Sequence, residues 1–140
     1  MPKFMKLLNN LSRSQAIYRR ANITSEELSS GHYAFALLIC RKPGSNQEEL
    51  ARELCINKST VARNLGCLEE QGYIIRTPLK SDKRQFLVYP TEKMKAVIPE
   101  LKKVSGEWTS LLSEGISEED LSVFHSVLER MEEKAREIIR

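Results

Sequence analysis

Five polar side chains between residues 58 and 64 have the types and spacing of groups that contact nucleic acid. They are Lys58, Ser59, Thr60, Arg63 and Asn64. An arginine guanidinium can donate two hydrogen bonds to a guanine, and an asparagine amide can pair with an adenine. Hydroxyl groups near the start of a helix suit contacts to phosphates or bases. This segment is therefore a candidate for reading the major groove of double-stranded DNA.

A second cluster of charged side chains spans residues 80–84, which read Lys-Ser-Asp-Lys-Arg. We expect Arg84 to enter the minor groove, where a narrow groove attracts arginine. Asp82 lies two residues before Arg84 and is placed to orient its guanidinium. Lys83 is a candidate phosphate contact, whose loss should flatten the salt dependence of binding.

Two short helices are predicted to position the first cluster. Asn46 caps the first helix, with Glu49 at the spacing of a capping box. Cys55 and Ile56 form the turn, and Asn57 caps the second helix. The inner face of the second helix is aliphatic and leaves its basic residues outside. That face consists of Val61, Leu65 and Leu68, and Gly72 is the expected stop.

Two strands are predicted to hold the second cluster between them. Residues 73–77 and 85–89 are rich in β-branched and aromatic side chains, and residues 78–84 form the polar loop. Helix, turn, helix, strand, loop and strand follow one another in the order of a winged helix-turn-helix. That shape places one helix in the DNA major groove. Winged helices also bind proteins, so a protein-binding module without DNA binding is the alternative.

Four further segments flank this core with helical patterns. Residues 2–21 form the first, and a polar break at 22–28 separates it from an apolar helix at 32–42 capped by Ser29. Thr91 starts a long helix that Pro99 should kink. Ser117 caps the last helix, whose apolar residues recur every 3.5 positions, the period of a helix packed along another helix. They are Leu121, Phe124, Leu128, Met131, Ala135 and Ile138.

Composition excludes several classes of protein. A chain of 140 residues that is 41% hydrophobic and 29% charged fits one globular domain. No apolar run approaches the ~20 residues of a membrane span, and the first residues lack a secretory signal, so we expect a cytoplasmic protein without membrane contact. The three cysteines contain no C-x-x-C pair. No catalytic or cofactor-binding spacing is present, so neither an enzyme nor a cofactor is expected.

Charge is distributed unevenly around a net value of +3. Residues 1–24 carry bases and no acid, and bases outnumber acids between residues 57 and 85. Acids outnumber bases between residues 113 and 140. This asymmetry favours a protein that meets phosphates on one side.

Across almost its whole length the chain resembles the MarR family of transcriptional regulators. The resemblance rests on four segments in this order: Gln47-Glu48-Glu49-Leu50-Ala51, Lys58-Ser59-Thr60-Val61-Ala62-Arg63, Leu68-Glu69-Glu70-Gln71-Gly72-Tyr73-Ile74, and Asp82-Lys83-Arg84 followed by Thr91. It implies a mainly α fold with a small β-wing, in one domain spanning residues 1–140. Residues 30–90 would be the DNA-binding lobe, and residues 1–21 and 91–140 the dimerisation helices.

The resemblance also implies a mode of action. Members are homodimers, and two-fold symmetry predicts an inverted-repeat operator with half-sites about 10 bp apart. The expected activity is repression relieved by a small effector. The effector cleft would lie near Arg13, His32 and Tyr33, side chains that favour a small aromatic acid.

Two positions depart from the family pattern. Gly66 lies within the predicted recognition helix, where glycine costs about 1 kcal/mol relative to alanine. Met94 stands near the start of the long helix, where the family often has glycine.

Overall fold

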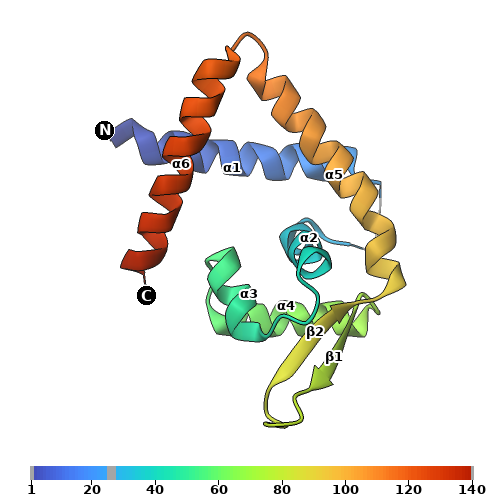
Figure 1. The fold of residues 1–140 in the computed structure, drawn as a ribbon. Coiled ribbons are helices and arrows are strands. Elements are labelled where there is room, and N and C mark those ends of the chain that lie inside the picture. The colour runs from blue at the N-terminus through green and yellow to red at the C-terminus, as the bar shows by residue number, and fades with distance from the viewer. Residues whose placement is uncertain (1, 25–27, 140) are drawn as a thin grey trace. The chain divides into compact units, whose positions relative to one another are not determined.

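A computed structural model describes residues 2–24 and 28–139 of the chain, so residues 25–27 of the predicted polar break lie outside the described part. The fold is mainly α-helical with one two-stranded sheet (Figure 1). Its elements are α1 (Pro2–Asn22), the 3₁₀ turn η1 (Ser30–His32), α2 (Tyr33–Arg41), α3 (Gln47–Leu54), α4 (Lys58–Glu70), β1 (Ile74–Pro78), β2 (Phe86–Pro90), α5 (Glu92–Ser113) and α6 (Glu118–Ile138). They form two compact units, residues 1–108 and 109–140.

The helix-turn-helix begins at the two asparagine caps that the sequence predicts. Asn46 Oδ1 accepts a hydrogen bond from the Glu49 backbone N–H at 2.9 Å, and Asn57 Oδ1 accepts one from the Thr60 N–H at 2.8 Å. Each bond satisfies a donor that the first helical turn leaves free. Cys55 ends α3 in the left-handed region with φ of 54°. A residue with a Cβ is about 1–2 kcal/mol less stable in this region than in the right-handed helical region, so the turn carries some backbone strain.

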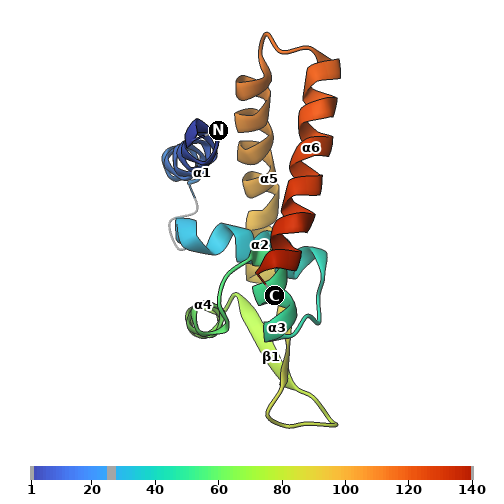
Figure 2. The ribbon, with the colours of Figure 1, turned by 90° about the vertical axis from the view of Figure 1, so that its left-hand side faces the viewer.

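The wing is an antiparallel hairpin shifted by one residue from its predicted bounds. β1 pairs with β2 so that Ile74 faces Pro90 and Pro78 faces Phe86. Ser45, just before α3, forms an isolated bridge to Val88, so the start of the helix-turn-helix is joined directly to the wing. The hairpin extends well beyond α4 (Figure 2).

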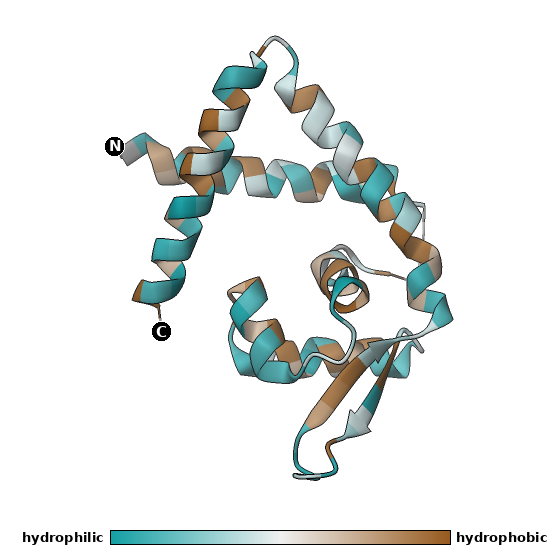
Figure 3. Ribbon diagram, viewed as in Figure 1, coloured by the Kyte–Doolittle hydropathy of each residue, from teal (hydrophilic) through white to brown (hydrophobic). Residues whose placement is uncertain are grey.

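The core of residues 1–108 lies where α2, α3, α4 and the wing meet. It contains the predicted inner face of α4, since Val61, Leu65 and Leu68 are all buried. Met94 is also fully buried, which explains a large apolar side chain where the family often has glycine. Apolar residues gather on α2 and β2, whereas the wing loop is hydrophilic (Figure 3). Burial of these apolar faces is the main force that holds α4 in place.

The apolar helix predicted at residues 32–42 is present as α2, which is one residue shorter at each end. A 3₁₀ turn precedes α2, and Ser29 makes no side-chain cap bond to it. Further along the chain, α5 runs unbroken through Pro99. It contacts α1 through the Tyr18 and Trp108 rings, whose centroids are 5.0 Å apart, and through a 3.3 Å hydrogen bond from Arg19 to Ser105.

Residues 109–140 comprise the end of α5 and the whole of α6. Gly115, with φ of 77°, makes the turn between them, and Ser117 caps α6 by accepting from the Asp120 N–H. None of the described residues of α6 is buried, although Phe124, Leu128 and Met131 form an apolar stripe. Among the described residues, no helix is both long enough and apolar enough to cross a lipid bilayer.

Candidate nucleic-acid interface

The outer face of α4 exposes Lys58, Ser59 and Arg63 of the first polar cluster, whereas Thr60 and Asn64 are half-buried. Because an α-helix turns by about 100° per residue, Ser59 and Arg63 lie on the side opposite Val61 and Leu65. Ser59 and Arg63 are exposed, whereas Val61 and Leu65 are buried. Figure 2 views α4 nearly along its axis, with the wing reaching past it. An exposed helix that carries basic side chains is the element that a helix-turn-helix protein places in the major groove.

Lys58 is held at the junction of α3 and α4. Its ammonium lies 2.7 Å from Glu48 Oε1, and this ion pair lowers the pKa of the Glu48 carboxyl. Gln47 donates a hydrogen bond to the Lys58 carbonyl at 3.0 Å. Both side chains of the ion pair are exposed, so a phosphate can compete for the ammonium with little loss of stability.

Arg63 and Asn64 have different surroundings. Arg63 is exposed, and its guanidinium donates a 3.4 Å hydrogen bond to Thr60 Oγ1. Asn64 is half-buried and donates to the Thr60 carbonyl at 2.8 Å, and its side chain opposes the lowering of the His32 pKa by burial. In this structure Arg63 is free to reach a base, whereas Asn64 is engaged at the inner side of α4.

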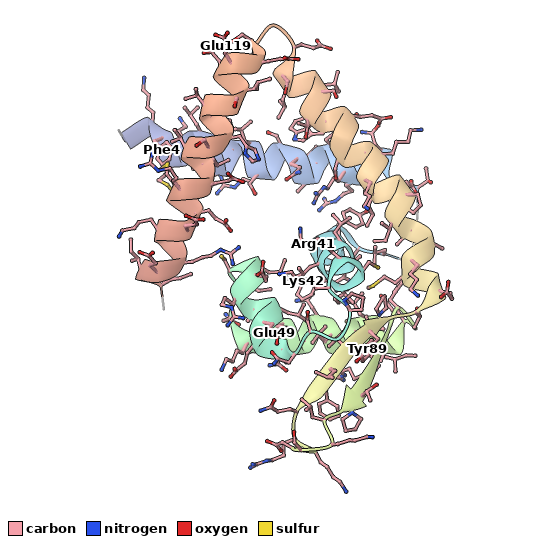
Figure 4. The ribbon with its side chains drawn as sticks, in the orientation of Figure 1. Phe4, Arg41, Lys42, Glu49, Tyr89 and Glu119 are labelled. Atoms are coloured by element: carbon pink, nitrogen blue, oxygen red, sulfur yellow. The ribbon has the colours of Figure 1, made fainter. Side chains whose placement is uncertain are left out.

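The structure brings Asp82 and Arg84 together at the wing tip. Asp82 Oδ1 accepts from the Arg84 backbone N–H at 3.0 Å and lies 3.3 Å from its guanidinium Nε. The Arg84 side chain is nevertheless 91% exposed. Side chains at the hairpin tip extend into solvent (Figure 4), and Lys83 is among the exposed residues of this loop. The carboxylate thus limits the directions of Arg84 while leaving it accessible.

A clamp between α4 and the wing was missed by sequence reasoning. Arg76 on β1 makes two hydrogen bonds to the Glu69 carboxylate on α4, at 3.1 and 3.0 Å. These bonds lower the pKa of Glu69 and raise that of Arg76. The guanidinium also lies 5.8 Å from the centre of the Phe86 ring. The available signal was strand alternation, which places the charge of Arg76 on the same face as the buried Ile74.

A pocket of about 210 Å³ lies between the start of α3, α4 and the wing. Lys58, Arg76 and Arg84 line it together with polar groups such as Gln47 and Gln85. Glu48 also lines this pocket. Each of the three cations is paired with a carboxylate: Lys58 with Glu48, Arg76 with Glu69 and Arg84 with Asp82. The pocket is therefore a polar groove whose basic side chains are held by acidic partners.

The start of α5 holds the end of α4. Thr91 Oγ1 donates to the Gly72 and Tyr73 carbonyls at 2.7 and 3.0 Å, and Lys93 Nζ donates to the Gln71 carbonyl at 2.7 Å. A cation at the carbonyl end of a helix is stabilised by its dipole. The orientation of the recognition helix is therefore tied to α5.

The three residues expected near an effector cleft differ in their exposure to solvent. Arg13 is exposed on α1, whereas His32 and Tyr33 are 8% and 4% exposed and Tyr33 is part of the core. Burial lowers the pKa of His32, and it raises the pKa of Tyr33. His32 makes no side-chain cap bond, and its Nδ1 is buried without a hydrogen-bond partner among the described residues.

Comparisons with known proteins agree with this geometry. The model of the MarR family matches residues 32–86, the segment from α2 to the start of β2. The uncharacterized HTH-type transcriptional regulator YybA of Bacillus subtilis (strain 168) is 31% identical over 105 residues, which cover 75% of this chain and 70% of the relative. The solved MarR transcriptional regulator of Methanosarcina mazei Go1 is 31% identical, with a TM-score of 0.89 over 99% of both chains.

A third similarity concerns the fold alone. A MarR family transcriptional regulator of Listeria monocytogenes, solved in complex with a 26mer DNA, has a TM-score of 0.90 at 23% identity. The match covers 98% of this chain and 91% of that one. The exposed basic face of α4, the arginine-bearing wing and these similarities lead to one conclusion. The chain belongs to the MarR family of winged helix-turn-helix transcriptional regulators, proteins that regulate transcription rather than catalyse reactions.

Proposed function

We propose that the protein is a homodimeric repressor that binds an inverted-repeat operator in double-stranded DNA. The observation that carries this proposal is the combination of an exposed Arg63 on α4 with an exposed, Asp82-oriented Arg84 at the wing tip. Arg63 would read a base edge in the major groove, and Arg84 the adjacent minor groove. Lys58, Lys83 and the hydroxyls of Ser59 and Thr60 would contact phosphates or nearby bases.

Selection of bound sequences from random double-stranded DNA tests this function. We expect the purified protein to enrich a palindrome with half-sites about 10 bp apart. A variant with Arg63→Ala should lose the preference at one base pair per half-site, whereas Lys134→Ala on α6 should not change it. A wild-type protein that enriches no sequence would refute DNA reading and favour a protein-binding winged helix.

We propose that α1 and residues 91–140 form the dimer interface. The supporting observation is the apolar stripe on α6, where Phe124, Leu128 and Met131 are 54%, 37% and 41% exposed. Apolar stripes of this kind usually mark interfaces, because leaving them in water is unfavourable. A second copy of the chain would supply the helix with which the 3.5-residue period of α6 is compatible.

The oligomeric state tests this interface. Light scattering or sedimentation at micromolar concentration should give a dimer for the wild type and monomers or aggregates for Leu128→Glu and Met131→Glu. Glu133→Lys, a charge change on the same helix, is the matched control and should remain dimeric. A well-behaved wild-type monomer would refute the proposal.

We propose that a small aromatic acid releases the protein from DNA by binding between α2 and α5. A pocket of about 470 Å³ there combines apolar and cationic side chains. They are Leu37, Cys40 and Ile98, with Arg41, Lys95 and Lys102. Figure 4 labels Arg41 at the end of α2. Burial raises the pKa of the Cys40 thiol, while Lys95 and Lys102 oppose that rise, which supports a positive potential at the apolar surface.

This pocket suits a carboxylate on an aromatic ring better than the expected trio does, since His32 and Tyr33 are buried. Release requires that the acid bind the DNA-incompetent arrangement more tightly than the competent one. Titration calorimetry with salicylate tests this. Lys102→Ala should weaken binding, and Arg13→Ala should not. Loss of binding in Arg13→Ala alone would assign the effector to α1, and absence of binding to the wild type would refute an aromatic-acid effector.

A further inference from the structure

Gly66 has no structural explanation within the described fold. It lies inside α4, eight residues after Lys58, where glycine is the least favourable residue other than proline. Its φ is not in the left-handed region, unlike those of Gly44, Gly72 and Gly115. A Cβ built on Gly66 would meet no described atom within 4 Å. Neither backbone conformation nor packing among the described residues therefore requires glycine here.

Helix geometry places Gly66 on the face that carries the basic side chain. Residues four and seven positions apart lie on one side of a helix, so Ser59, Arg63 and Gly66 form a single row. Ser59 and Arg63 are exposed. Glu70 follows on the same side and is also exposed. Because phosphates repel a carboxylate, the part of α4 that faces DNA should end before Glu70.

This row is short enough to lie within the major groove. At 1.5 Å per residue, the seven steps from Ser59 to Gly66 span about 10 Å, and the major groove is about 12 Å wide. Gly66 can therefore still face base edges when Ser59 lies near one side of the groove. A backbone without a side chain at that point allows DNA to approach the helix itself.

We infer that Gly66 is a specificity-determining residue, at which the edge of a base pair packs directly against the backbone of α4. This inference rests on the proposed DNA-binding function. A methyl group at position 66 would hold the helix away from the groove floor. Arg63, one turn earlier on the same row, would then be drawn beyond the 2.7–3.2 Å range of a good hydrogen bond to its base. An apolar projection such as a thymine methyl suits contact with a bare Cα.

The test compares Gly66→Ala and Gly66→Ser on the operator selected by the wild-type dimer. Alanine should raise Tm by about 3–5 °C, because it favours the helix and meets no clash. Affinity for the operator should nevertheless fall about tenfold for both variants, the size of one mismatched base pair. Repeated selection with Gly66→Ala should change the preference at a base pair next to the one read by Arg63.

Cys67→Ala is the matched control for helix stiffness. Cys67 is the exposed neighbour of Gly66, and alanine there strengthens the helix without adding volume. It should leave operator affinity unchanged. The inference would be overturned if Gly66→Ala bound the operator as tightly as the wild type does. It would also be overturned if alanine but not serine lowered operator affinity, because a stiffer helix would then be the cause. Failure of the wild type to select any DNA would instead overturn the proposed function.

Discussion

The Arg76–Glu69 clamp predicts a measurable coupling between the wing and the recognition helix. The perturbation is Arg76→Ala, Glu69→Ala and the corresponding double variant. Arg76 and Glu69 form two parallel hydrogen bonds, at 3.1 and 3.0 Å, between β1 and α4. Their side chains are 28% and 43% exposed, so solvent weakens but does not abolish the attraction. The two elements are otherwise joined by the turn at residues 71–73 and by buried apolar contacts.

The magnitude follows from this geometry. Exposed ion pairs contribute about 0.2–1 kcal/mol, and a bidentate pair of a guanidinium with a carboxylate lies at the upper end of that range. Arg76→Ala also removes the cation–π contact between the guanidinium and the Phe86 ring. Such a contact contributes about 0.5 kcal/mol at an exposed site. We expect Arg76→Ala to lower the free energy of unfolding by about 1.5 kcal/mol, with a coupling to Glu69 of about 1 kcal/mol.

Urea denaturation of the four proteins gives the coupling free energy directly. The measurement has a pH signature, because the pKa of Glu69 is lowered in the folded protein. The clamp is fully present above the ordinary glutamate pKa of about 4.3 and is lost as pH falls through the lower folded-state value. Lys95→Ala, which removes an exposed pair to Glu92, is the control. A coupling below about 0.3 kcal/mol at neutral pH would refute the clamp.

Three further predictions concern single side chains. Arg63→Ala should cost about 1–3 kcal/mol of operator binding and leave Tm nearly unchanged, whereas Val61→Asp should unfold the helix-turn-helix because Val61 is fully buried; an equal loss of stability in Arg63→Ala would mean that the faces of α4 are misassigned. Lys83→Ala should weaken binding to all sequences and flatten the salt slope by about one unit, so an unchanged slope in a salt titration excludes it from the interface. Burial lowers the pKa of His32, so as the pH falls the imidazole is protonated in the unfolded chain before it is protonated in the folded protein. The free energy of unfolding should therefore fall as pH drops below about 6.5. Urea denaturation between pH 5 and 7 should show a smaller fall in His32→Gln.

Local chemistry in the sequence determined the helix-turn-helix and the wing. The caps at Asn46 and Asn57 and the inner residues of α4 were predicted and are present, because caps and hydrophobic periodicity depend on residues within one or two turns. The wing was predicted to within one residue at each end. The contact between Asp82 and Arg84 also followed from spacing, since the two residues are two positions apart.

Tertiary packing decided what local pattern cannot encode. His32 and Tyr33 looked like available polar groups, but they are buried because α2 packs against its neighbours with more than one face. Asn64 lies at the inner side of α4, where its side chain opposes the lowering of the His32 pKa, although its neighbour Arg63 faces outward. Arg76 meets Glu69 only because the chain reverses between α4 and β1. Each outcome depends on which elements become neighbours, and burying their apolar faces together determines that choice.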